Sequence, residues 1–416
     1  MTSHASRPGN FPVRTIGDGD WAAFLEVDSV AFGGTMPAEL NELEREMFEP
    51  GRSIGAFDGP APVGIATAYS FDLSVPGAVL PAAGISWVGV LPTHRRRGVM
   101  RALMTHQLHD IHERGREPLA ILWASEPPIY GRFGYGLASH RFGLEVLRSP
   151  RALRDDVPID PTLRLRLVPA DDWKNTADVY AQVARRHPGM MARDERWWRK
   201  AVRDLPSMRE GKSALRCVIA EDDTGVRGYA RYATQPDWTP GRPQGIVHVR
   251  EVAALDAPAS ALLYRYLFDQ DLMGKVDLWN VPVDDPLLLW IDNVRAASPR
   301  WFDAVYARLV EVPIALRSRT YATPVDVVLA VADTICPWND GSWHLVADDD
   351  RVTCQPTDRP PDLSMTVTEL GAAYLGGTLL TDLGMAGRVV EHTPGALTAA
   401  STAFHSSPAP WCPVVF

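Results

Sequence analysis

Cysteines and long apolar runs are scarce in this sequence, and each scarcity excludes a class of protein. Among 416 residues there are four cysteines, and no two of them form a Cys-x-x-Cys pair: Cys217, Cys336, Cys354 and Cys412. That spacing excludes a disulfide framework and a paired-cysteine zinc site, so we expect reduced, mostly buried thiols. No apolar run is long enough to span a membrane, and the opening MTSHASRPGN lacks the apolar core of a signal peptide. We therefore expect a cytoplasmic protein without a membrane partner.

Positive charge is also in short supply. The chain has 42 lysines and arginines against 51 aspartates and glutamates, which gives a formal net charge of −9. This balance argues against a general nucleic-acid binder and favours a cationic partner. Hydrophobic residues make up 46% of the chain, as in an ordinary globular protein. Because 416 residues exceed what one hydrophobic core supports, we expect two or three domains.

Alternating strand and helix patterns predict a mixed α/β (α+β) architecture. In the N-terminal third, the helix over 19–31 is expected to be capped by Asp18 or Asp20, and apolar residues three or four apart predict a helix from Val99 to Gly115. The expected strands there are 13–16, 53–57, 63–71, 85–91, 119–124 and 140–147.

A stretch rich in Arg, Asp and Pro between Arg148 and Asp160 predicts a linker, and a further domain is expected to begin near Trp301. Pro258 suits the first turn of a helix that Asp256 would cap. Beyond the linker we expect helices at 171–186, 258–267 and 368–375, and strands at 215–221, 228–234, 310–315, 343–347 and 363–367.

Three consecutive arginines, Arg95, Arg96 and Arg97, stand between a predicted strand and a predicted helix and are followed by Gly98. The first N–H groups of a helix lack internal partners and carry its positive dipole end, so they bind anions. Gly98 would let a phosphate approach the backbone, and the guanidinium groups would add charged hydrogen bonds. The alternative is a solvated basic turn. Neither G-x-x-x-x-G-K-[ST] nor G-x-G-x-x-G is present here.

The segment VGVLPTHRRRGVM resembles the acetyl-CoA motif of GNAT N-acetyltransferases, Arg/Gln-x-x-Gly-x-Gly/Ala. Arg95 and Gly98 fill its first two positions, and Met100 departs from the third. The longer string PTHRRRG, followed further on by ASEPPIYGRFGYG, is similar to the Eis (enhanced intracellular survival) family of acetyltransferases.

This resemblance implies a three-part chain and a chemistry. Residues 1–152 would form a catalytic GNAT domain, residues 153–300 a GNAT-like domain without the cofactor motif, and residues 301–416 a sterol-carrier-protein-like domain. The subunits would assemble as homohexamers. Acetyl-CoA would be the co-substrate, no metal would take part, and the acceptor would be a cationic amine such as an aminoglycoside or a lysine side chain.

The resemblance also assigns residues to roles. Tyr130 would be the general acid, since a phenol is protonated at neutral pH, whereas Tyr135 is expected to pack. The carboxylate of Phe416 would be the general base. The cofactor-binding positions would be Val88, Gly89, Val90, Arg95, Arg96, Arg97, Gly98, Val99, Met100, Arg101, Ser125 and Glu126.

The ending WCPVVF is too apolar for a solvated tail, so we expect it to be docked, with Val414, Val415 and Phe416 as its anchors. The family has an acidic residue where this chain has Val415, and that departure bears on the acceptor range.

Acidic and aromatic groups near the transfer site would bind a cationic acceptor. The candidates are Asp28, Trp87 and Asp292, each of which has a purely structural role as its alternative. His94 is expected to be a turn residue. We expect the face of the 99–115 helix to expose three histidines to solvent: His106, His109 and His112.

The competing function is a binding protein, in which degenerate GNAT domains accompany a C-terminal domain that holds an apolar ligand. The complete arginine turn and Tyr130 favour the enzyme.

Overall fold

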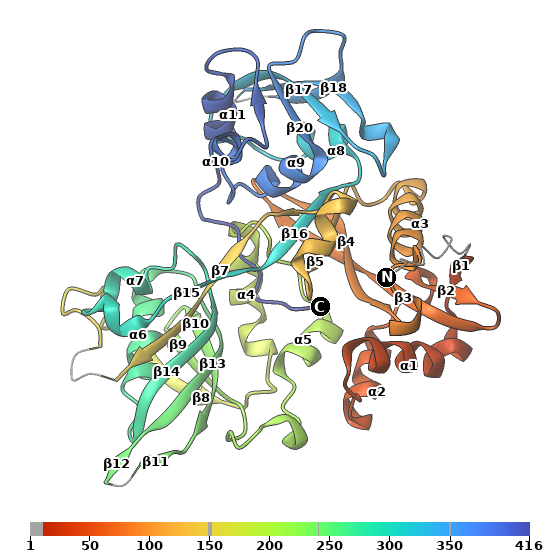
Figure 1. The fold of residues 1–416 in the computed structure, drawn as a ribbon. Helices are drawn as coiled ribbons and strands as arrows, with labels where there is room; N and C mark the ends of the chain where they lie inside the picture. Colours follow the sequence, from red (N-terminus) through yellow and green to blue (C-terminus); the bar gives the residue numbers. More distant parts are fainter. Residues whose placement is uncertain (1–10, 149–151, 240, 349–350) are drawn as a thin grey trace, which may run out of the picture. The chain divides into compact units, whose positions relative to one another are not determined.

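The computed structural model describes residues 11–148, 152–239, 241–348 and 351–416. The chain divides into two compact units (Figure 1). Unit 1 contains the chain up to Ala138, Val305–Ser406 and Val415–Phe416, and unit 2 contains Ser139–Ala304 and Ser407–Val414. All four cysteines are buried, as expected, and none of them forms a disulfide within the described chain. No helix in the described part of the chain has the length and apolar character needed to cross a bilayer.

The first sheet of unit 1 has seven strands, and only β4 and β5 run parallel. Its order is β1 (Val13–Thr15), β2 (Ser53–Asp58), β3 (Ala61–Val75), β4 (Ala78–Val90), β5 (Leu119–Trp123), β16 (Val305–Leu309) and β6 (Gly136–Leu137).

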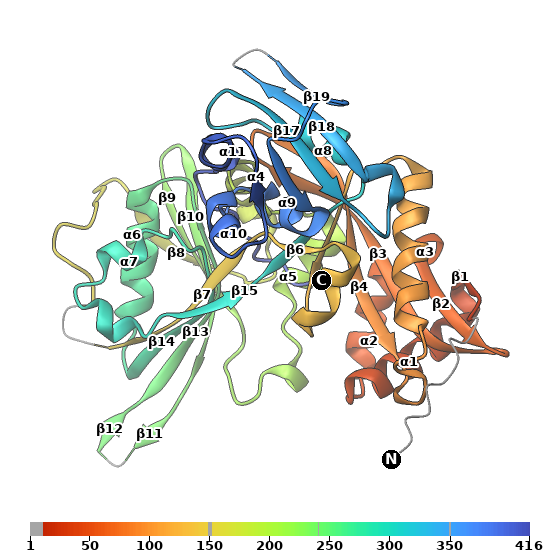
Figure 2. The same ribbon diagram turned by 45° about the horizontal axis from the view of Figure 1, so that its top comes forward.

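Helices cover both faces of this sheet. Figure 2 shows α3 (Val99–Arg114) along β3 and β4, where Val99 and Leu103 pack in one core with Ile85. The other face carries α1 (Trp21–Phe32), which contributes Trp21 and Phe24 to an aromatic cluster. The helix α2 (Ala38–Met47) follows α1 in the chain.

The helix ends follow the sequence signals only in part. Gly115 ends α3 in the left-handed conformation, as predicted. The prediction that an aspartate caps α1 is wrong for Asp20, which occupies the N-cap position without a capping bond. Its carboxylate instead accepts from the Gly17 N–H and binds Arg14.

A second, five-stranded sheet of unit 1 comes from the C-terminal part of the chain. Its order is β19 (Val352–Pro356), β18 (Gly341–Ala347), β17 (Val325–Ala332), β20 (Leu363–Thr366) and β21 (Val390–Glu391). Its helices are α8 (Val312–Arg317), α9 (Val367–Tyr374), α10 (Leu380–Met385) and α11 (Ala396–Phe404). The helix predicted at 368–375 is α9, and a capping box of Thr366 and Glu369 begins it.

The strand predicted at 310–315 is wrong, because β16 ends at Leu309 and α8 begins at Val312. Pro313 lies in the first turn of α8. A proline has no N–H to give to a sheet, but it suits this helical position.

Unit 2 repeats the strand succession of the first sheet. Its order is β15 (Arg300–Asp303), β7 (His140–Leu147), β14 (Met273–Val281), β13 (Gly245–Ala254), β10 (Gly225–Gln235), β9 (Arg216–Asp222) and β8 (Arg164–Val168), with β13 and β14 parallel. Its helices are α4 (Lys174–Arg186), α5 (Glu195–Val202), α6 (Ala257–Phe268) and α7 (Leu287–Trp290), and β11 (Trp238–Thr239) pairs with β12 (Arg242–Pro243).

The two seven-stranded sheets do not follow the order of the chain. The strand β7 lies within the predicted 1–152 domain but pairs with β14 and β15 in unit 2. Conversely, β16 lies beyond residue 300 and pairs with β5 and β6 in unit 1. The boundaries 1–152, 153–300 and 301–416 stay predictions, and sheet membership crosses both of them. Of the predicted linker, residues 149–151 lie outside the described chain, while Leu153 bridges to Ile291.

Candidate functional site

Strands β4 and β5 separate at one end of the first sheet. They pair from Ala82 with Leu119 to Ile85 with Leu122, and within the described residues the pairing stops there although β4 continues to Val90. On its other side β4 remains paired with β3 as far as Val90. The backbone groups of β4 that face the opening are therefore available to a ligand, as a strand edge is to an added strand.

A bulge lies at the same place. Ser86 is opposite Thr67 and Gly89 is opposite Ile65, so Trp87 and Val88 together face a single residue of β3. Trp87 has a φ of 54°, in the left-handed region. A bulge bends its strand and shifts the alternation of side chains. Ala83 and Ile85 precede the bulge, whereas Val88 and Val90 follow it, yet all four pack in the core that contains α3.

The arginine turn connects β4 to α3 through a short 3-10 helix, Pro92–His94. Arg96 has a φ of 61°, and Gly98, at the N-cap of α3, has a φ of 95°. Gly98 makes no side-chain cap, and the first turn of α3 contains no acidic residue. A Cβ at Gly98 would meet nothing within 4 Å. The N-terminal N–H groups of α3, from Val99 to Arg101, thus stay open to an anion.

The arginines around these groups have no acidic partner in the described chain. Arg95 donates to the Ala31 carbonyl at 3.2 Å, and the Arg97 guanidinium lies 5.1 Å from the centre of the Phe11 ring. Arg95, Arg96 and Arg101 are exposed. Positive side chains and a free helix N-terminus that are not neutralised internally suit a phosphate.

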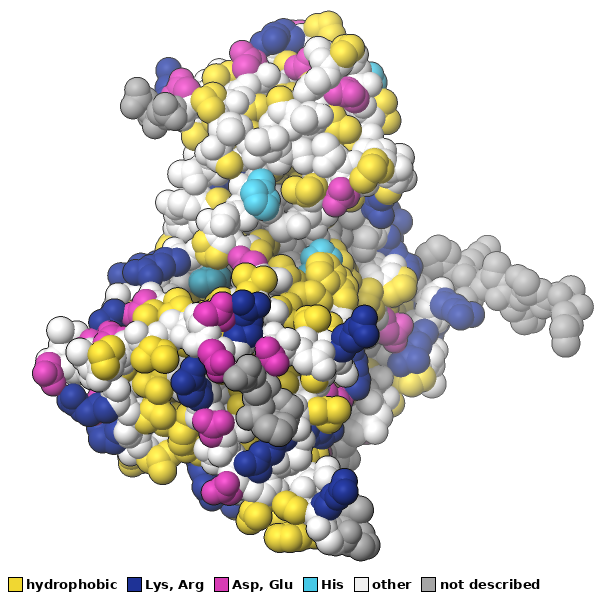
Figure 3. Space-filling model, turned by 90° about the vertical axis from the view of Figure 1, so that its left-hand side faces the viewer, with side chains coloured by type: hydrophobic (Ala, Val, Ile, Leu, Met, Phe, Trp, Pro, Cys, Tyr) yellow, Lys and Arg dark blue, Asp and Glu magenta, His cyan; other side chains and the backbone are white. Residues whose placement is uncertain are grey.

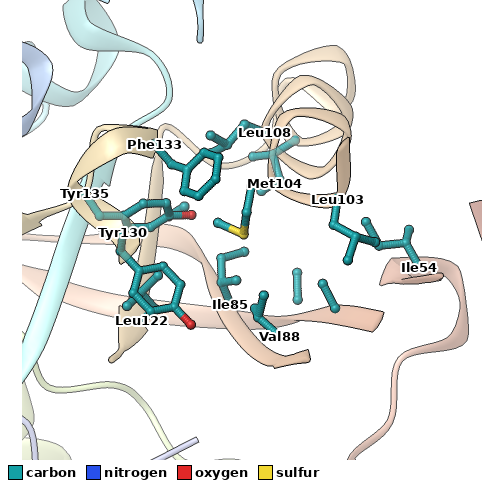
Figure 4. Packing of buried hydrophobic residues seen from close by; sticks show 14 of the residues in the cluster. Ile54, Ile85, Val88, Leu103, Met104, Leu108, Leu122, Tyr130, Phe133 and Tyr135 are labelled. Atoms are coloured by element: carbon teal, nitrogen blue, oxygen red, sulfur yellow. The ribbon is translucent and has the colours of Figure 1, made fainter. Parts of the chain in front are cut away.

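Tyr130 lies on the β5 side of the opening, in the 3-10 segment Pro127–Phe133. Only 4% of it is exposed, and it packs in the core with Ile85 and Val88 of β4 (Figure 4). Burial raises the pKa of the phenol; a side-chain hydrogen bond with Ser125 lowers it and the charge of Glu126 raises it. The phenol therefore stays protonated at neutral pH. Ser125 and Glu126 are exposed and lead directly into this segment.

Tyr135 is 1% exposed, with its ring centre 6.3 Å from that of Tyr130. Among the described residues its hydroxyl has no hydrogen-bond partner, which agrees with the packing role predicted for it.

Phe416 lies on β4, on the sheet face opposite α3. Its ring is 5.0 Å from that of Phe71, edge to face, and a Cβ at Gly84 would lie 3.2 Å from it. Gly84 alternates with Ala83 and Ile85, which face α3. The missing side chain at Gly84 is what lets the aromatic rings lie against the strand. The expectation that Val415 also anchors the tail is wrong, because 49% of it is exposed.

Trp87 belongs to the aromatic cluster beside α1. Its ring lies 5.4 Å from that of Phe24, and its indole N–H donates to the Tyr69 hydroxyl at 2.8 Å. Asp28 of α1 is half-buried, and burial together with the charge of Glu44 raises its pKa to about 6. Glu44 of α2 is itself only 6% exposed. The structure thus brings a half-buried carboxyl group of α1 and a buried one of α2 near each other.

Sequence reasoning missed Glu44 and Trp123. Glu44 is one of four glutamates in AELNELEREM, a composition typical of a solvated helix, so nothing local distinguishes it. Trp123 ends β5, and its buried indole N–H finds no hydrogen-bond partner in the part of the chain that the structure describes. No sequence signal marks it, because the polarity of its surroundings depends on distant residues.

Asp292 lies in unit 2, where it is exposed after α7 and its N–H donates to the Ala152 carbonyl at 3.1 Å. Its role in acceptor binding stays a prediction. Among the residues that the structure describes, no three His, Cys, Asp or Glu side chains gather as metal ligands would.

The histidines of α3 correct one expectation. His106 is exposed, but His109 bonds to the Ile335 carbonyl at 3.0 Å and His112 stacks on Trp338 at 3.7 Å. Those two pack against a neighbouring segment of unit 1, so they are not on a solvated face. His94 is a turn residue as predicted, bonded to Thr93 and Asp58.

Family models match nearly the whole chain in three parts. Residues 12–138 match an acetyltransferase (GNAT) domain, residues 189–309 match a second one, and residues 312–413 match a sterol carrier protein domain. The first of these ranges contains the opening of the sheet, the arginine turn and Tyr130. The matches confirm the predicted fold class.

Relatives cover the chain almost end to end. An uncharacterized N-acetyltransferase of Streptomyces avermitilis is 47% identical over 404 residues, which are 96% of this chain and 98% of the relative. The N-acetyltransferase Eis of Mycobacterium tuberculosis is 31% identical over 399 residues, 93% of this chain and 95% of the relative. The crystal structure of Eis1 from Mycobacterium abscessus superposes with a TM-score of 0.83 at 33% identity, covering 97% of this chain and 100% of that one. The chain therefore belongs to the Eis family of GNAT N-acetyltransferases.

Proposed function

We propose that this protein transfers the acetyl group of acetyl-CoA directly to an amine of a small cationic acceptor or of a lysine side chain. The observation that carries the proposal is the combination, at one opening of one sheet, of an acid-free arginine turn, a free strand edge and a buried phenol.

GNAT acetyltransferases use acetyl-CoA, and the residues here fit it. The pyrophosphate would bind the N-terminal N–H groups of α3 with Arg96, Arg97 and Arg101, where no carboxylate of the first turn competes. The pantetheine arm has amide groups, and the backbone of Val88–Val90 offers matching donors and acceptors at the opening.

The acceptor is expected on the other face of β4, beside Phe416. Asp28 and Glu44 would hold its positive charge, and the face of Trp87 would add a cation–π contact. The protein's overall charge of −9 would attract such a ligand rather than repel it. Val415 replaces the family's acidic residue, and this departure bears on the range of acceptors. Aminoglycosides are therefore one class of acceptor to test.

The chemistry divides between two proton-transfer groups. An uncharged amine nitrogen of the acceptor forms a bond to the thioester carbon and loses a proton to the carboxylate of Phe416, directly or through a water molecule. The carbon–sulfur bond breaks, and the departing thiolate takes the proton of the Tyr130 hydroxyl. The products are the N-acetyl amine and free CoA. Backbone N–H groups at the bulge would stabilise the oxyanion that forms at the carbonyl.

Thiol release tests this function. The protein is incubated with acetyl-CoA and a panel of aminoglycosides, lysine peptides and small arylalkylamines, and free CoA is measured with a thiol reagent. Release that depends on a cationic amine, with the acetylated amine identified by mass, is the expected result. If no amine in the panel promotes release while the protein binds an apolar ligand, the competing binding function holds instead.

A further inference from the structure

Unit 2 contains the same opening as the first sheet. Its parallel strands β13 and β14 pair only as far as Val249 with Leu278, although β13 continues to Ala254. Arg231 is opposite Glu251 and Tyr232 is opposite Val249, so Arg250 forms a bulge beside the last pair. Bulge and opening therefore recur at corresponding positions of the two sheets.

At this second opening, the helix N-terminus that corresponds to the start of α3 is already occupied by a side chain. Asp256 caps α6 by accepting from the Ala259 N–H at 3.0 Å, and it also binds Arg227. Pro258, in the first turn, has no N–H to offer. A carboxylate at the helix N-terminus repels a phosphate, so the opening in unit 2 does not suit CoA.

A segment of the chain's own C-terminal region is bound at this opening. The Trp411 indole donates to Asn280 Oδ1 at 2.8 Å, and Asn280 Nδ2 donates to the Cys412 carbonyl at 2.9 Å. Because an indole N–H can only donate, it fixes which way the Asn280 amide points. Asn280 lies on β14, two residues beyond the last pair with β13. A cavity of ≈330 Å³ remains beside Trp411 and Pro408.

Further contacts hold the same segment. The Trp411 N–H donates to the Pro188 carbonyl at 2.8 Å, and the Ala409 N–H donates to Asp284 at 2.7 Å. Gly189 has a φ of 92°, and a Cβ there would lie 3.0 Å from the Trp411 carbonyl oxygen. Trp411 is 4% exposed and Cys412 is fully buried.

We propose that the opening of the second GNAT-like sheet binds residues 408–414 through Asn280 and thereby sets the position of Phe416. Val415 and Phe416 follow this segment directly, and both belong to unit 1. In this arrangement the repeated sheet binds a peptide segment where its counterpart would bind pantetheine. Asn280 is then a positioning residue for the base. The catalytic part of this inference rests on the proposed function, whereas the binding of the segment does not.

The reactivity of the Cys412 thiol measures whether residues 408–414 stay bound. In full-length Asn280→Ala, the Cys412 thiol should react with a thiol reagent at least ~10-fold faster than in the wild type, as in local opening. The buried thiols Cys217, Cys336 and Cys354 are internal controls, because unfolding of the whole molecule would expose them too. Peptide mass analysis assigns the labelled cysteine. Asn280→Asp keeps the acceptor for the indole and loses the donor to Cys412, so it should give an intermediate rate. Asn175→Ala, a surface asparagine of α4, is the matched control.

Activity is measured on the same variants. Faster Cys412 labelling with a kcat lowered by ~10-fold or more, and an unchanged Kd for acetyl-CoA, supports the proposal. Cys412 labelling at the wild-type rate in Asn280→Ala overturns it. Faster labelling with a wild-type kcat keeps the binding of the segment and overturns the role of Phe416 as base, so the two failures are distinct.

Discussion

Tyr130 and Tyr135 are buried phenols five residues apart, but their surroundings differ. Tyr130 lies in the 3-10 segment that follows Ser125 and Glu126, on the β5 side of the opening between β4 and β5. Its hydroxyl interacts with Ser125. The Tyr135 hydroxyl is buried and has no hydrogen-bond partner among the described residues. The two hydroxyls therefore differ in their hydrogen bonding, which is a distinction that the composition of YGRFGY does not make.

Replacing Tyr130 by phenylalanine removes the hydroxyl and keeps the ring. We expect kcat to fall by ~10²–10⁴-fold because a positioned acid is lost, with little change in folding or in affinity for acetyl-CoA. Tyr135→Phe is the matched control and should keep the wild-type rate, since it removes a hydroxyl that has no partner. Steady-state kinetics of both variants check this, and equal rates for wild type and Tyr130→Phe would assign the acid elsewhere.

The raised pKa of Asp28 predicts that the free energy of unfolding depends on pH. Its pKa is raised to about 6, so the folded protein holds this proton more tightly than the unfolded chain does. The ionised carboxylate therefore lowers the free energy of unfolding above pH 6, and this cost disappears as the pH falls from 6 towards the ordinary value of 3.8. Asp28→Asn should stabilise the protein at pH 8 by about 1 kcal/mol, after allowance for partial exposure, and progressively less below pH 6.

The same substitution should weaken the binding of the cationic acceptor. At pH 8 the KM for a cationic amine should rise ~10-fold in Asp28→Asn, and the wild-type KM should rise as Asp28 is protonated below pH 6. Glu26→Gln, on the exposed face of the same helix, is the control. Thermal melts and KM values at pH 8 and pH 5 measure both effects, and an unchanged KM would place the cation elsewhere.

At the scale of elements, the arginine turn is expected to bind the cofactor together with the N-terminus of α3. Arg96→Ala or Arg97→Ala should weaken acetyl-CoA binding by ~1.5–3 kcal/mol for each charged hydrogen bond lost. Arg97 also lies over Phe11, so Arg96 is the cleaner test. Arg116→Ala, an exposed arginine beyond the other end of α3, is the control. Calorimetry that finds the wild-type affinity in the Arg96→Ala/Arg97→Ala double variant would show that the phosphates of acetyl-CoA do not bind at this turn.

The terminal segment makes a second prediction at this scale. Adding one glycine after Phe416 moves the carboxylate by ~3.5 Å, whereas a ~1 Å error already costs ~10²-fold in rate. We therefore expect a C-terminal extension to abolish turnover and an N-terminal tag to leave it intact. Full activity with the extension, verified by intact mass, would show that Phe416 is not the base.

At the scale of the whole molecule, several large apolar side chains are exposed on the surface. Figure 3 shows hydrophobic side chains interspersed with the charged ones on the face that it presents. In unit 2 the exposed large apolar residues include Leu289 at 77%, Trp301 at 57% and Leu147 at 57%. Exposed apolar groups of this size are typical of contact surfaces when they are contiguous.

The homohexamer remains a prediction and has a direct test. A chain of 45.8 kDa should elute and scatter light as a species of six times that mass. Apolar exposed side chains would drive the assembly, so a charge substitution such as Trp301→Glu should reduce the mass without unfolding the protein. A stable wild-type monomer at micromolar concentration would contradict the prediction.

The sequence by itself determined what depends on neighbours along the chain. The period of three or four from Val99 and the stop at Gly115 define α3, Asp256 and Pro258 begin α6, and the arginines lie at a helix start because a strand precedes them. These features follow from local periodicity and capping, whereas the family was indicated by the resemblance of the strings PTHRRRG and ASEPPIYGRFGYG. The same local reasoning mistook the apolar run after Leu309 for a strand, because it gave too little weight to Pro313.

Only the tertiary structure decided which distant residues meet. Sheet edges accept whichever strand is adjacent in space, so β7 and β16 join sheets other than those that their order in the chain suggests. The bulge at Trp87 depends on the register against β3. The raised pKa of Asp28 depends on its own burial and on the charge of Glu44, and Asn280 meets Trp411 across 131 positions. Register, burial and long-range hydrogen bonds are set by the packing of the whole fold, which no local pattern of residues encodes.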